Sequence, residues 1–379
     1  MKKAVSVLLS FVLVLNFCLP VSFAEEQSVI DLDCPSAILI EGSTQEVLYQ
    51  KEPDVERPMA SVTKIMTLLL IMEALKEGKI TLETMVTCSE HAVSMGGSQV
   101  YLKEGESLSV NDMLKAITVS SANDAAVAMG EHIAGSDTAF VSLMNKRAEE
   151  LGMKHTNFVN CTGLDAEGHY SSARDIAIMS SELLKHDLIR NYTTIWMDSL
   201  RDGAFGLSNT NKLVRFYEGC TGLKTGSTSK ALYCMSASAK RGGMELIAVV
   251  LASPTSPKRF EDAKKLLNFG FAGYEIYNKE ITLPSTIEII GAKNKSASVS
   301  GTENINLLLK KGISSKINIE IKMEESLNAP AEKGMKVGEV NLVAGEEILH
   351  NYPIILTEKV EKATFLDIFL QIIKVFLTV

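Results

Sequence analysis

The chain has 379 residues, of which 46% are hydrophobic and 22% are charged, and its formal net charge at pH 7 is −8. This length exceeds what one hydrophobic core usually organises, so it predicts two folded domains. The acidic balance argues against nucleic acid as a partner, because phosphate contacts need a basic surface.

The N-terminus has the layout of a secretory signal peptide. Two lysines precede an apolar run over residues 4–19, and a small-residue pattern ends at Ala24, where cleavage is expected. Cys18 is not interpreted as a lipoprotein cysteine, because the bulky Phe17 precedes it. Cleavage removes two lysines and no acid, which leaves about 355 residues with a charge of −10. We therefore expect an exported protein.

The cysteines that follow this leader are widely spaced and include no C-x-x-C pair: Cys34, Cys88, Cys161, Cys220 and Cys234. Their spacing predicts neither a metal site nor a cofactor. One disulfide can form after export, but small buried thiols are the preferred interpretation.

The first part of the mature chain predicts a hairpin followed by helices. Residues 37–50 contain two short apolar pieces around a Glu-Gly-Ser turn, which predicts a β-hairpin. Residues 62–75 form an apolar run that predicts a buried helix with Gly78 as its stop. Further helices are expected over residues 111–119, 125–133, 137–151 and 176–184.

Polar connections join these elements. Gly96-Gly97 is too short to cradle a phosphate and predicts a tight turn. A Ser-Ser-Ala-Asn-Asp break between two helices places Ser121 and Asn123 on a short connection. The purely structural alternative is that Asn123 or Asp124 is a helix N-cap.

The connection before the helix at 176–184 carries a histidine and a capping pattern. Ser172 and Asp175 have the spacing of a capping box that opens this helix. His169 has no metal ligand or serine at a recognisable spacing, so we interpret it as a structural residue.

The C-terminal part changes in character twice. Residues 220–253 predict three antiparallel strands, and a helix over 259–267 follows them. After Tyr277, short alternating strands punctuated by glycines predict a separate all-β domain. The expected organisation is a signal peptide at 1–24, a main domain at 25–277, a β domain at 278–356 and a C-terminal tail at 357–379.

Three short motifs occur in an order that is specific as a set. They are Ser61-x-x-Lys64 at a helix start, Ser121-x-Asn123 between two helices, and Lys224-Thr225-Gly226 on a strand. An S-x-x-K pattern alone is weak evidence, since Ser227-x-x-Lys230 also fits but opens no helix. The ordered set makes a chance coincidence improbable.

These residue types suit acyl transfer to a serine. Lys64 projects from the same helix face as Ser61 and accepts its proton only when neutral. That requires the pKa of Lys64 to fall by about three units, and burial and the second cation Lys224 both act in this direction. Thr225 and Lys224 offer a hydroxyl and a cation to a substrate carboxylate, and a strand edge can pair with an extended peptide.

On these motifs the chain resembles the penicillin-binding D-alanyl-D-alanine carboxypeptidases of low molecular mass, relatives of the class A β-lactamases. The resemblance covers nearly the whole mature chain. It implies an α/β (α+β) serine β-lactamase/transpeptidase-like catalytic domain with a smaller C-terminal all-β domain. It also implies a serine-type D-Ala-D-Ala carboxypeptidase that acts on peptidoglycan stem peptides and is inhibited by β-lactam antibiotics.

The resemblance further implies a role for each motif residue. Ser61 is the acylated nucleophile with Lys64 as its base, and Ser121 and Lys224 complete the proton network. The substrate-binding residues are Asn123, Lys224, Thr225, Gly226, Ser227 and Arg259. The backbone N–H groups of Ser61 and Ser227 bind the oxyanion. Arg259 holds the terminal carboxylate, and an ordinary surface arginine on a helix is its alternative interpretation.

Two departures from the family pattern limit this transfer. Ser227 stands where relatives often have histidine, so rates and pH dependence are not carried over. No Glu-x-x-Leu-Asn pattern, which activates the deacylating water in class A β-lactamases, occurs in residues 154–186. A β-lactam adduct should therefore be lost slowly. The alternatives are a β-lactamase, an endopeptidase, and a non-catalytic penicillin sensor or wall-binding protein. The complete motif set disfavours the non-catalytic protein.

The last residues predict an amphipathic helix. Between 363 and 379 the polar residues form one narrow stripe: Thr364, Asp367, Gln371, Lys374 and Thr378. Such a helix reaches roughly 25 Å, short of the ~30 Å hydrocarbon core of a bilayer. We therefore expect it to lie flat on the membrane surface as an anchor. The alternative is a helix that docks on its own β domain.

Overall fold

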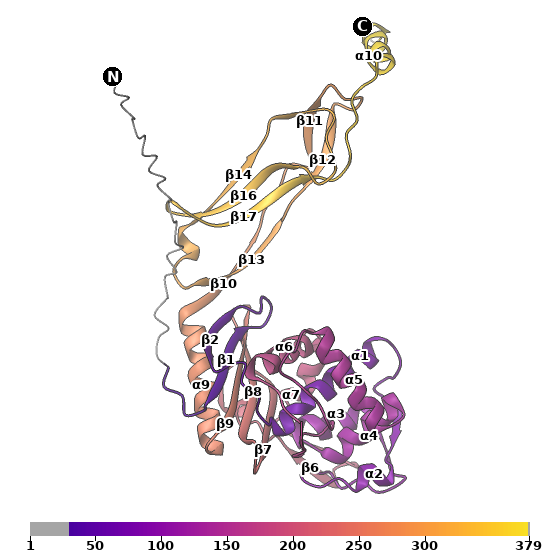
Figure 1. The fold of residues 1–379 in the computed structure, drawn as a ribbon, viewed down its shortest axis with the longest axis vertical. Helices are drawn as coiled ribbons and strands as arrows, with labels where there is room; N and C mark the ends of the chain where they lie inside the picture. The colour runs from indigo at the N-terminus through magenta and orange to yellow at the C-terminus, as the bar shows by residue number, and fades with distance from the viewer. Residues whose placement is uncertain (1–29, 378–379) are drawn as a thin grey trace, which may run out of the picture. The chain divides into compact units, whose positions relative to one another are not determined.

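The fold was obtained as a computed structural model that describes residues 30–377, with only the backbone described at 371, 372 and 374–377. The expected signal peptide at 1–24 lies outside the described residues. The remaining chain contains a mixed helix and strand domain followed by strands and one terminal helix (Figure 1).

A five-stranded antiparallel sheet forms one layer of the main domain. Its strand order is β2-β1-β9-β8-β7, so β7 is an edge strand. The strands are β1 (Ser36–Glu41), β2 (Val47–Lys51), β7 (Cys220–Thr228), β8 (Leu232–Arg241) and β9 (Met244–Ser253). The expected N-terminal hairpin and the three expected antiparallel strands are confirmed.

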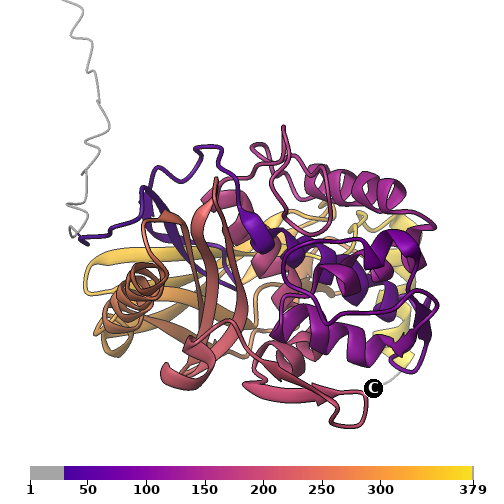
Figure 2. The same cartoon turned by 90° about the horizontal axis from the view of Figure 1, so that it is seen from below.

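Helices cover both faces of this sheet (Figure 2). On one face lies α9 (Ser256–Gly273), which is longer than the helix predicted over 259–267. The other face carries a helical layer that includes α1 (Lys64–Lys76), α3 (Val110–Val119), α4 (Asn123–Ala134), α5 (Asp137–Glu150) and α6 (Ala173–Leu184). Ser172 caps α6 by accepting a hydrogen bond from the Asp175 backbone N–H at 3.1 Å, as the capping pattern predicts.

Short elements connect these layers. They are α2 (Glu90–Val93), η2 (Asp187–Ile189), α7 (Arg190–Thr193), α8 (Leu213–Phe216) and two small two-stranded sheets, β3 (Met85–Thr87) with β4 (Ser107–Ser109) and β5 (Met197–Leu200) with β6 (Phe205–Ser208). The five cysteines within residues 30–377 are free thiols, in agreement with the preferred interpretation.

Helix α1 is the centre of the main domain, with nine of its 13 residues buried. It ends before Gly78, which takes a left-handed φ of 70° as expected for a stop residue. Ser61 differs from the prediction, because it lies in a 3₁₀ turn, η1 (Ala60–Thr63), that precedes α1. Such tight turns are common at helix starts, and Lys64 is therefore the first residue of the α-helix.

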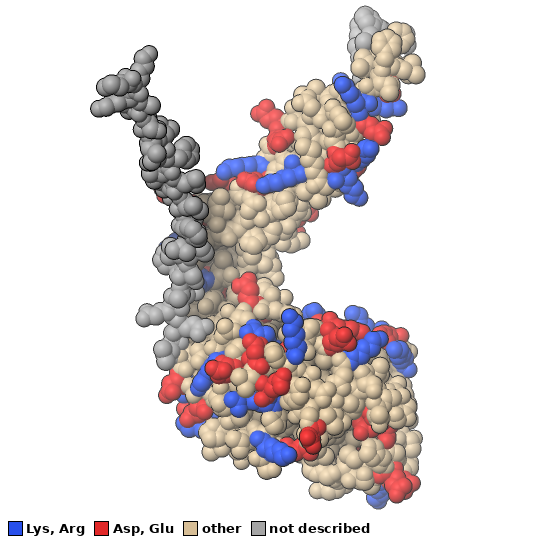
Figure 3. Space-filling view, in the orientation of Figure 1, with Lys and Arg blue, Asp and Glu red and all other residues tan. Residues whose placement is uncertain are grey.

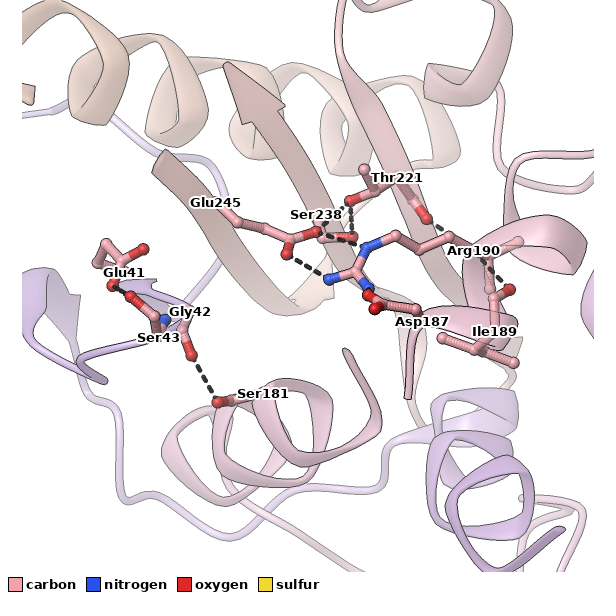
Figure 4. Close-up of polar contacts among 11 residues, drawn as sticks. Glu41, Gly42, Ser43, Ser181, Asp187, Ile189, Arg190, Thr221, Ser238 and Glu245 are labelled. Atoms are coloured by element: carbon pink, nitrogen blue, oxygen red, sulfur yellow. Dashed lines mark hydrogen bonds and ion pairs between the residues drawn. The ribbon is translucent and has the colours of Figure 1, made fainter. Parts of the chain in front are cut away.

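A polar network anchors the first residues of β7 (Figure 4). Arg190 on α7 pairs with Glu245 on β9 at 2.5 Å, and both side chains are largely buried. The Thr221 hydroxyl on β7 donates to Glu245 at 2.9 Å and lies 2.7 Å from the Ser238 hydroxyl on β8. Charge-assisted hydrogen bonds in a half-buried setting are strong, so the start of the strand that carries Lys224 is fixed.

The second domain is all-β, as predicted. Its strands are β10 (Tyr274–Glu280), β11 (Thr286–Ile290), β12 (Ser296–Ser300), β13 (Asn304–Lys310), β14 (Ile317–Met323), β15 (Ser326–Asn328), β16 (Lys336–Ala344) and β17 (Glu347–Leu356), with one 3₁₀ turn, η3 (Ser314–Lys316). Six strands form a sheet in the order β14-β16-β17-β12-β11-β15, while β10 pairs with β13. Its core contains Ile305, Val340, Leu342, Ile354 and Leu356. Pairing begins at Tyr274, slightly before the expected boundary at 277.

The described part of the tail forms helix α10 (Phe365–Leu377). Thr364 and Asp367 cap its start reciprocally, since each side chain accepts a hydrogen bond from the backbone N–H of the other. No helix among residues 30–377 is both long and apolar enough to cross a membrane.

Candidate active site

The 3₁₀ turn η1, directly before the central helix, meets the edge strand β7 at Ser61. A Cβ atom on Gly226 would lie 2.7 Å from the Ser61 backbone nitrogen and 2.9 Å from the Met59 carbonyl oxygen. These separations are too short for any side chain, so only glycine lets the strand approach the turn so closely. Gly226 therefore brings the Lys-Thr-Gly motif to Ser61, as the ordered motifs predict.

Lys64 is fully buried beside Ser61. Its Nζ atom lies 3.1 Å from the Ser61 Oγ, 2.5 Å from the Asn123 Oδ1 and 2.6 Å from the Thr162 carbonyl oxygen. Two of the three motifs thus meet at one amine. Thr162 lies on the loop that precedes His169. Because a main-chain acceptor carries no residue-type signal, its contact with Lys64 was not predicted.

Burial lowers the pKa of Lys64 to about 7, because the charged ammonium loses its hydration. Electrostatic interactions with Cys161 and Asp124 oppose this shift in part. The result matches the depression of about three units that the sequence argument requires for a base near neutral pH.

The loop that carries Thr162 is tightly organised. The Asn160 side chain accepts hydrogen bonds from the backbone N–H groups of Thr162 and Gly163, at 3.1 and 2.7 Å. Gly163 has a left-handed φ of 86°, and a Cβ there would lie 1.9 Å from the Ala60 carbonyl oxygen. The loop therefore presses directly on η1 and fixes the Thr162 carbonyl next to Lys64.

His169 is buried and stabilises η1 through hydrogen bonds. Its Nδ1 accepts a hydrogen bond from the Val159 N–H at 3.0 Å, which leaves Nε2 to donate to the Thr63 hydroxyl at 2.8 Å. Thr63 in turn donates to the Ala60 carbonyl at 2.8 Å. Burial lowers the pKa of His169 to about 4. The residue is thus neutral and structural, in agreement with its interpretation from the sequence.

Ser121 lies in the break between α3 and α4, and Asn123 is the first residue of α4. Ser121 takes a left-handed φ of 63° and is 4% exposed. No hydrogen bond links its hydroxyl to another residue within the described part of the chain, so its place in a proton network stays a prediction. The N-cap alternative is wrong, because Ala122 is the N-cap of α4 and the Asn123 side chain bonds to Lys64 instead.

Lys224 is a second buried amine, only 1% exposed. Its Nζ donates to the Thr225 carbonyl at 3.1 Å. Burial first, and then the positive charges of Lys64 and Arg259, hold the pKa of Lys224 well below its usual range. A substrate carboxylate that enters this site would favour the charged form of the Lys224 amine, because a nearby opposite charge raises its pKa.

Arg259 on α9 reaches under the end of β7. It is 6% exposed and donates to the carbonyl oxygens of Gly226 at 3.0 Å and Cys234 at 3.3 Å. The surface-arginine alternative is therefore wrong. Ser227, one residue beyond Gly226, is exposed at the end of the motif strand.

This fold and this arrangement define the class of protein, namely a serine hydrolase in which a lysine lies beside the serine. The sequence model of the family described as D-alanyl-D-alanine carboxypeptidase matches residues 22–255. The model described as penicillin-binding protein 5, C-terminal domain, matches residues 271–362. The chain therefore belongs to the D-alanyl-D-alanine carboxypeptidase family, the penicillin-binding proteins of low molecular mass.

Individual relatives agree with this assignment over nearly the full length. The chain is 44% identical to the D-alanyl-D-alanine carboxypeptidase DacF of Bacillus subtilis, an alignment that covers 97% of this chain and 96% of the relative. It is 32% identical to DacA of Escherichia coli, with 91% and 88% covered. Penicillin-binding protein 5 of Haemophilus influenzae superposes with a TM-score of 0.77 at 30% identity, covering 88% of this chain and 99% of that one. The expected fold class is confirmed.

Proposed function

We propose that this protein removes the terminal D-alanine of peptidoglycan stem peptides through an acyl-enzyme on Ser61. The observation that carries the proposal is the hydrogen bonding around Lys64. A neutral lysine amine has two N–H groups and one lone pair. The carbonyl oxygens of Asn123 and Thr162 accept the two N–H groups, at 2.5 and 2.6 Å. The lone pair is then left to accept the Ser61 hydroxyl proton across 3.1 Å.

The reaction follows from this geometry. Ser61 Oγ attacks the carbonyl of the penultimate D-alanine while Lys64 takes the hydroxyl proton. Backbone N–H groups of Ser61 and Ser227 stabilise the oxyanion. The C–N bond then breaks, and the proton passes to the leaving amine with Ser121 and Lys224 in the relay. Water attacks the ester next, and Ser61 regains its proton as the peptide carboxylate departs.

Recognition of the substrate terminus is assigned to Lys224, Thr225 and Arg259. A peptide that ends in D-alanine carries a carboxylate, and Lys224 is a buried amine that becomes a charge-assisted donor when a carboxylate binds beside it. The Arg259 guanidinium adds positive charge behind the same strand. Because β7 is an edge strand, the rest of the peptide can pair with it in an extended form, with Asn123 bonding its amide.

β-Lactam antibiotics should acylate the same serine. Penicillin-binding protein D2 of Listeria monocytogenes, known in an ampicillin-bound form, superposes on this chain with a TM-score of 0.59 at 33% identity. The absence of a Glu-x-x-Leu-Asn sequence from residues 154–186 supports slow deacylation rather than β-lactamase turnover.

The activity is tested by incubating the purified mature protein with a peptide that ends in D-Ala-D-Ala and assaying free D-alanine. We expect stoichiometric release of one D-alanine for each peptide, and no release by Ser61→Ala. Release of a larger fragment from a cross-linked dimer, without release from the linear peptide, would instead identify an endopeptidase.

We also propose the chain organisation that an exported wall enzyme needs. Residues 1–24 direct export, 25–277 carry the reaction, 278–356 form the β domain and 357–379 attach the protein to the outer face of the cytoplasmic membrane. Exposure of the apolar side chains of α10 supports the attachment. Phe365, Leu366, Phe369 and Leu370 are at least 50% exposed, and the described part of the helix has an almost uncharged surface (Figure 3). That exposure disfavours docking on the β domain.

Burial of this face in lipid has a favourable free energy. Six large apolar side chains, even half buried, gain on the order of 5 kcal/mol. Removal of the helix, in a protein that ends at Glu361, should therefore release the enzyme from the membrane fraction without loss of activity on soluble peptides. Leu366→Glu combined with Phe369→Glu should do the same with the chain length unchanged. Continued sedimentation of both variants with liposomes would contradict the anchor.

A further inference from the structure

The turn at residues 95–99 lies against Asn123. The Gly96 carbonyl accepts a hydrogen bond from the Asn123 Nδ2 at 2.6 Å, and the Ser98 carbonyl accepts one from the Asn123 backbone N–H at 2.7 Å. The sequence predicts a tight turn at Gly96-Gly97 but gives it no function. Its contacts are with a motif residue that touches Lys64.

The Gly96 carbonyl determines which way the Asn123 carboxamide faces. With Nδ2 toward Gly96, Oδ1 faces the Lys64 amine at 2.5 Å. The flipped carboxamide would oppose two oxygens across 2.6 Å and turn an NH₂ group toward the amine, which is unfavourable at both ends. The second N–H of Nδ2 has no acceptor among the described residues, so it remains available for a substrate carbonyl.

Gly97 provides the space in which this carboxamide sits. Its φ is 79°, and a Cβ there would lie 2.8 Å from the Asn123 Nδ2. That separation is shorter than real Cβ contacts. Any side chain at residue 97 must therefore displace the carboxamide of Asn123, which is itself 3% exposed and confined.

Hydrogen bonds also fix the residues that follow this turn, so the turn cannot move away from an added side chain. The buried Asp124 carboxylate accepts hydrogen bonds from the backbone N–H groups of Val100 at 3.2 Å and Leu102 at 3.0 Å. Arg201 donates to the Val100 carbonyl at 3.0 Å and pairs with Glu106 at 2.6 Å. Because these contacts fix the segment, a side chain added at residue 97 would displace the Asn123 side chain and not the turn.

We propose that the turn at residues 95–99 is a positioning element for acylation, in which the Gly96 carbonyl orients the Asn123 carboxamide and the absence of a side chain at Gly97 leaves it room. The proposal rests on the function assigned to Ser61 and Lys64. Gly96 and Gly97 act through Asn123 and do not touch the substrate's reacting atoms.

The test compares Gly97→Ala with Gly105→Ala. Gly105 has nearly the same φ, 76°, but a Cβ there meets nothing within 4 Å, so both changes impose similar backbone strain and only one displaces Asn123. We expect acylation by a fluorescent penicillin to slow by roughly 10- to 100-fold in Gly97→Ala and by less than about 2-fold in Gly105→Ala. Both proteins should still carry the label on Ser61.

The pH profile distinguishes positioning from a general loss of structure. Asn123 Oδ1 accepts a hydrogen bond from Lys64 and favours its charged form, so displacement of this oxygen lowers the pKa of Lys64. The acid limb of the acylation profile, expected near the Lys64 pKa of about 7, should move to lower pH in Gly97→Ala and stay in place in Gly105→Ala.

A double-variant cycle completes the test. In an Asn123→Ala background no carboxamide remains to be displaced, so Gly97→Ala should add less than about a 2-fold loss. If Gly97→Ala folds only in that background, the clash with Asn123 is demonstrated directly. The proposal is overturned if Gly97→Ala behaves like Gly105→Ala, if the losses are additive, or if neither Gly97 variant folds. Label on a residue other than Ser61 in the unmodified protein would instead reject the proposed function.

Discussion

Lys64→Met is expected to reduce the acylation of this enzyme by penicillin at least about 10³-fold. Methionine occupies a similar volume but has no amine, so Ser61 loses the base that accepts its proton while the core remains filled. The loss is predicted to appear in the chemical step and not in binding. Stopped-flow measurement of adduct formation over a range of penicillin concentrations separates the two.

The dependence of this rate on pH follows from the pKa of Lys64. Burial lowers that pKa from 10.5 to about 7, and only the neutral amine accepts the proton. Acylation by the unmodified enzyme should therefore rise with pH through about 7 and level off above it. A rate that is constant from pH 5 to 9 would contradict the assignment of Lys64 as the base.

The second S-x-x-K pattern supplies a matched control. Lys230 is exposed in the turn between β7 and β8, so Lys230→Met makes the same chemical change outside the site. We expect its acylation rate and pH profile to equal those of the unmodified enzyme. A comparable loss in the two lysine variants would show that Lys64→Met acts through general damage.

Lys224→Ala is expected to lower kcat/KM for a peptide acid by about 100-fold and for the matching peptide amide by less than about 10-fold. The acid loses a charge-assisted hydrogen bond to a buried cation, a contribution of about 1.5–3 kcal/mol, whereas the amide has no carboxylate to lose. Arg259 remains behind the strand and retains part of the attraction. Assay of D-alanine or D-alanine amide release gives both constants.

An equal loss on the acid and the amide would contradict the carboxylate role of Lys224. Thr225→Val is a useful companion, because it removes only a hydroxyl that donates to Thr210 at 2.7 Å in the free enzyme. Its effect on the acid should be smaller than that of Lys224→Ala, since a neutral hydrogen bond contributes about 1 kcal/mol.

Local sequence signals predicted most of the architecture. The apolar run after Ser61, the stop at Gly78 and the alternation in residues 220–253 each report on contacts made within a short stretch of chain. The order of the three motifs predicted which distant segments meet, because their chemistry is useful only together. The 3₁₀ start of the central helix was missed, since the same residues suit either kind of turn.

The sequence could not predict the main-chain contacts that position the side chains of the site. The Thr162 carbonyl at Lys64 and the Gly96 carbonyl at Asn123 are main-chain groups, which every residue type carries. The sequence alone does not distinguish a site role from a surface position for Arg259, because its burial depends on how α9 packs against the sheet. Such long-range packing leaves no local pattern in the chain.

The central claim, an acyl-enzyme on Ser61, is tested most directly by locating a penicillin adduct. The mature protein is treated with penicillin, digested and analysed by mass spectrometry at successive times after removal of free drug. We predict one adduct per chain on the peptide that contains Ser61, persisting far longer than a β-lactamase intermediate. Label on Ser227, no label at all, or rapid loss of the adduct as hydrolysed drug would contradict this account.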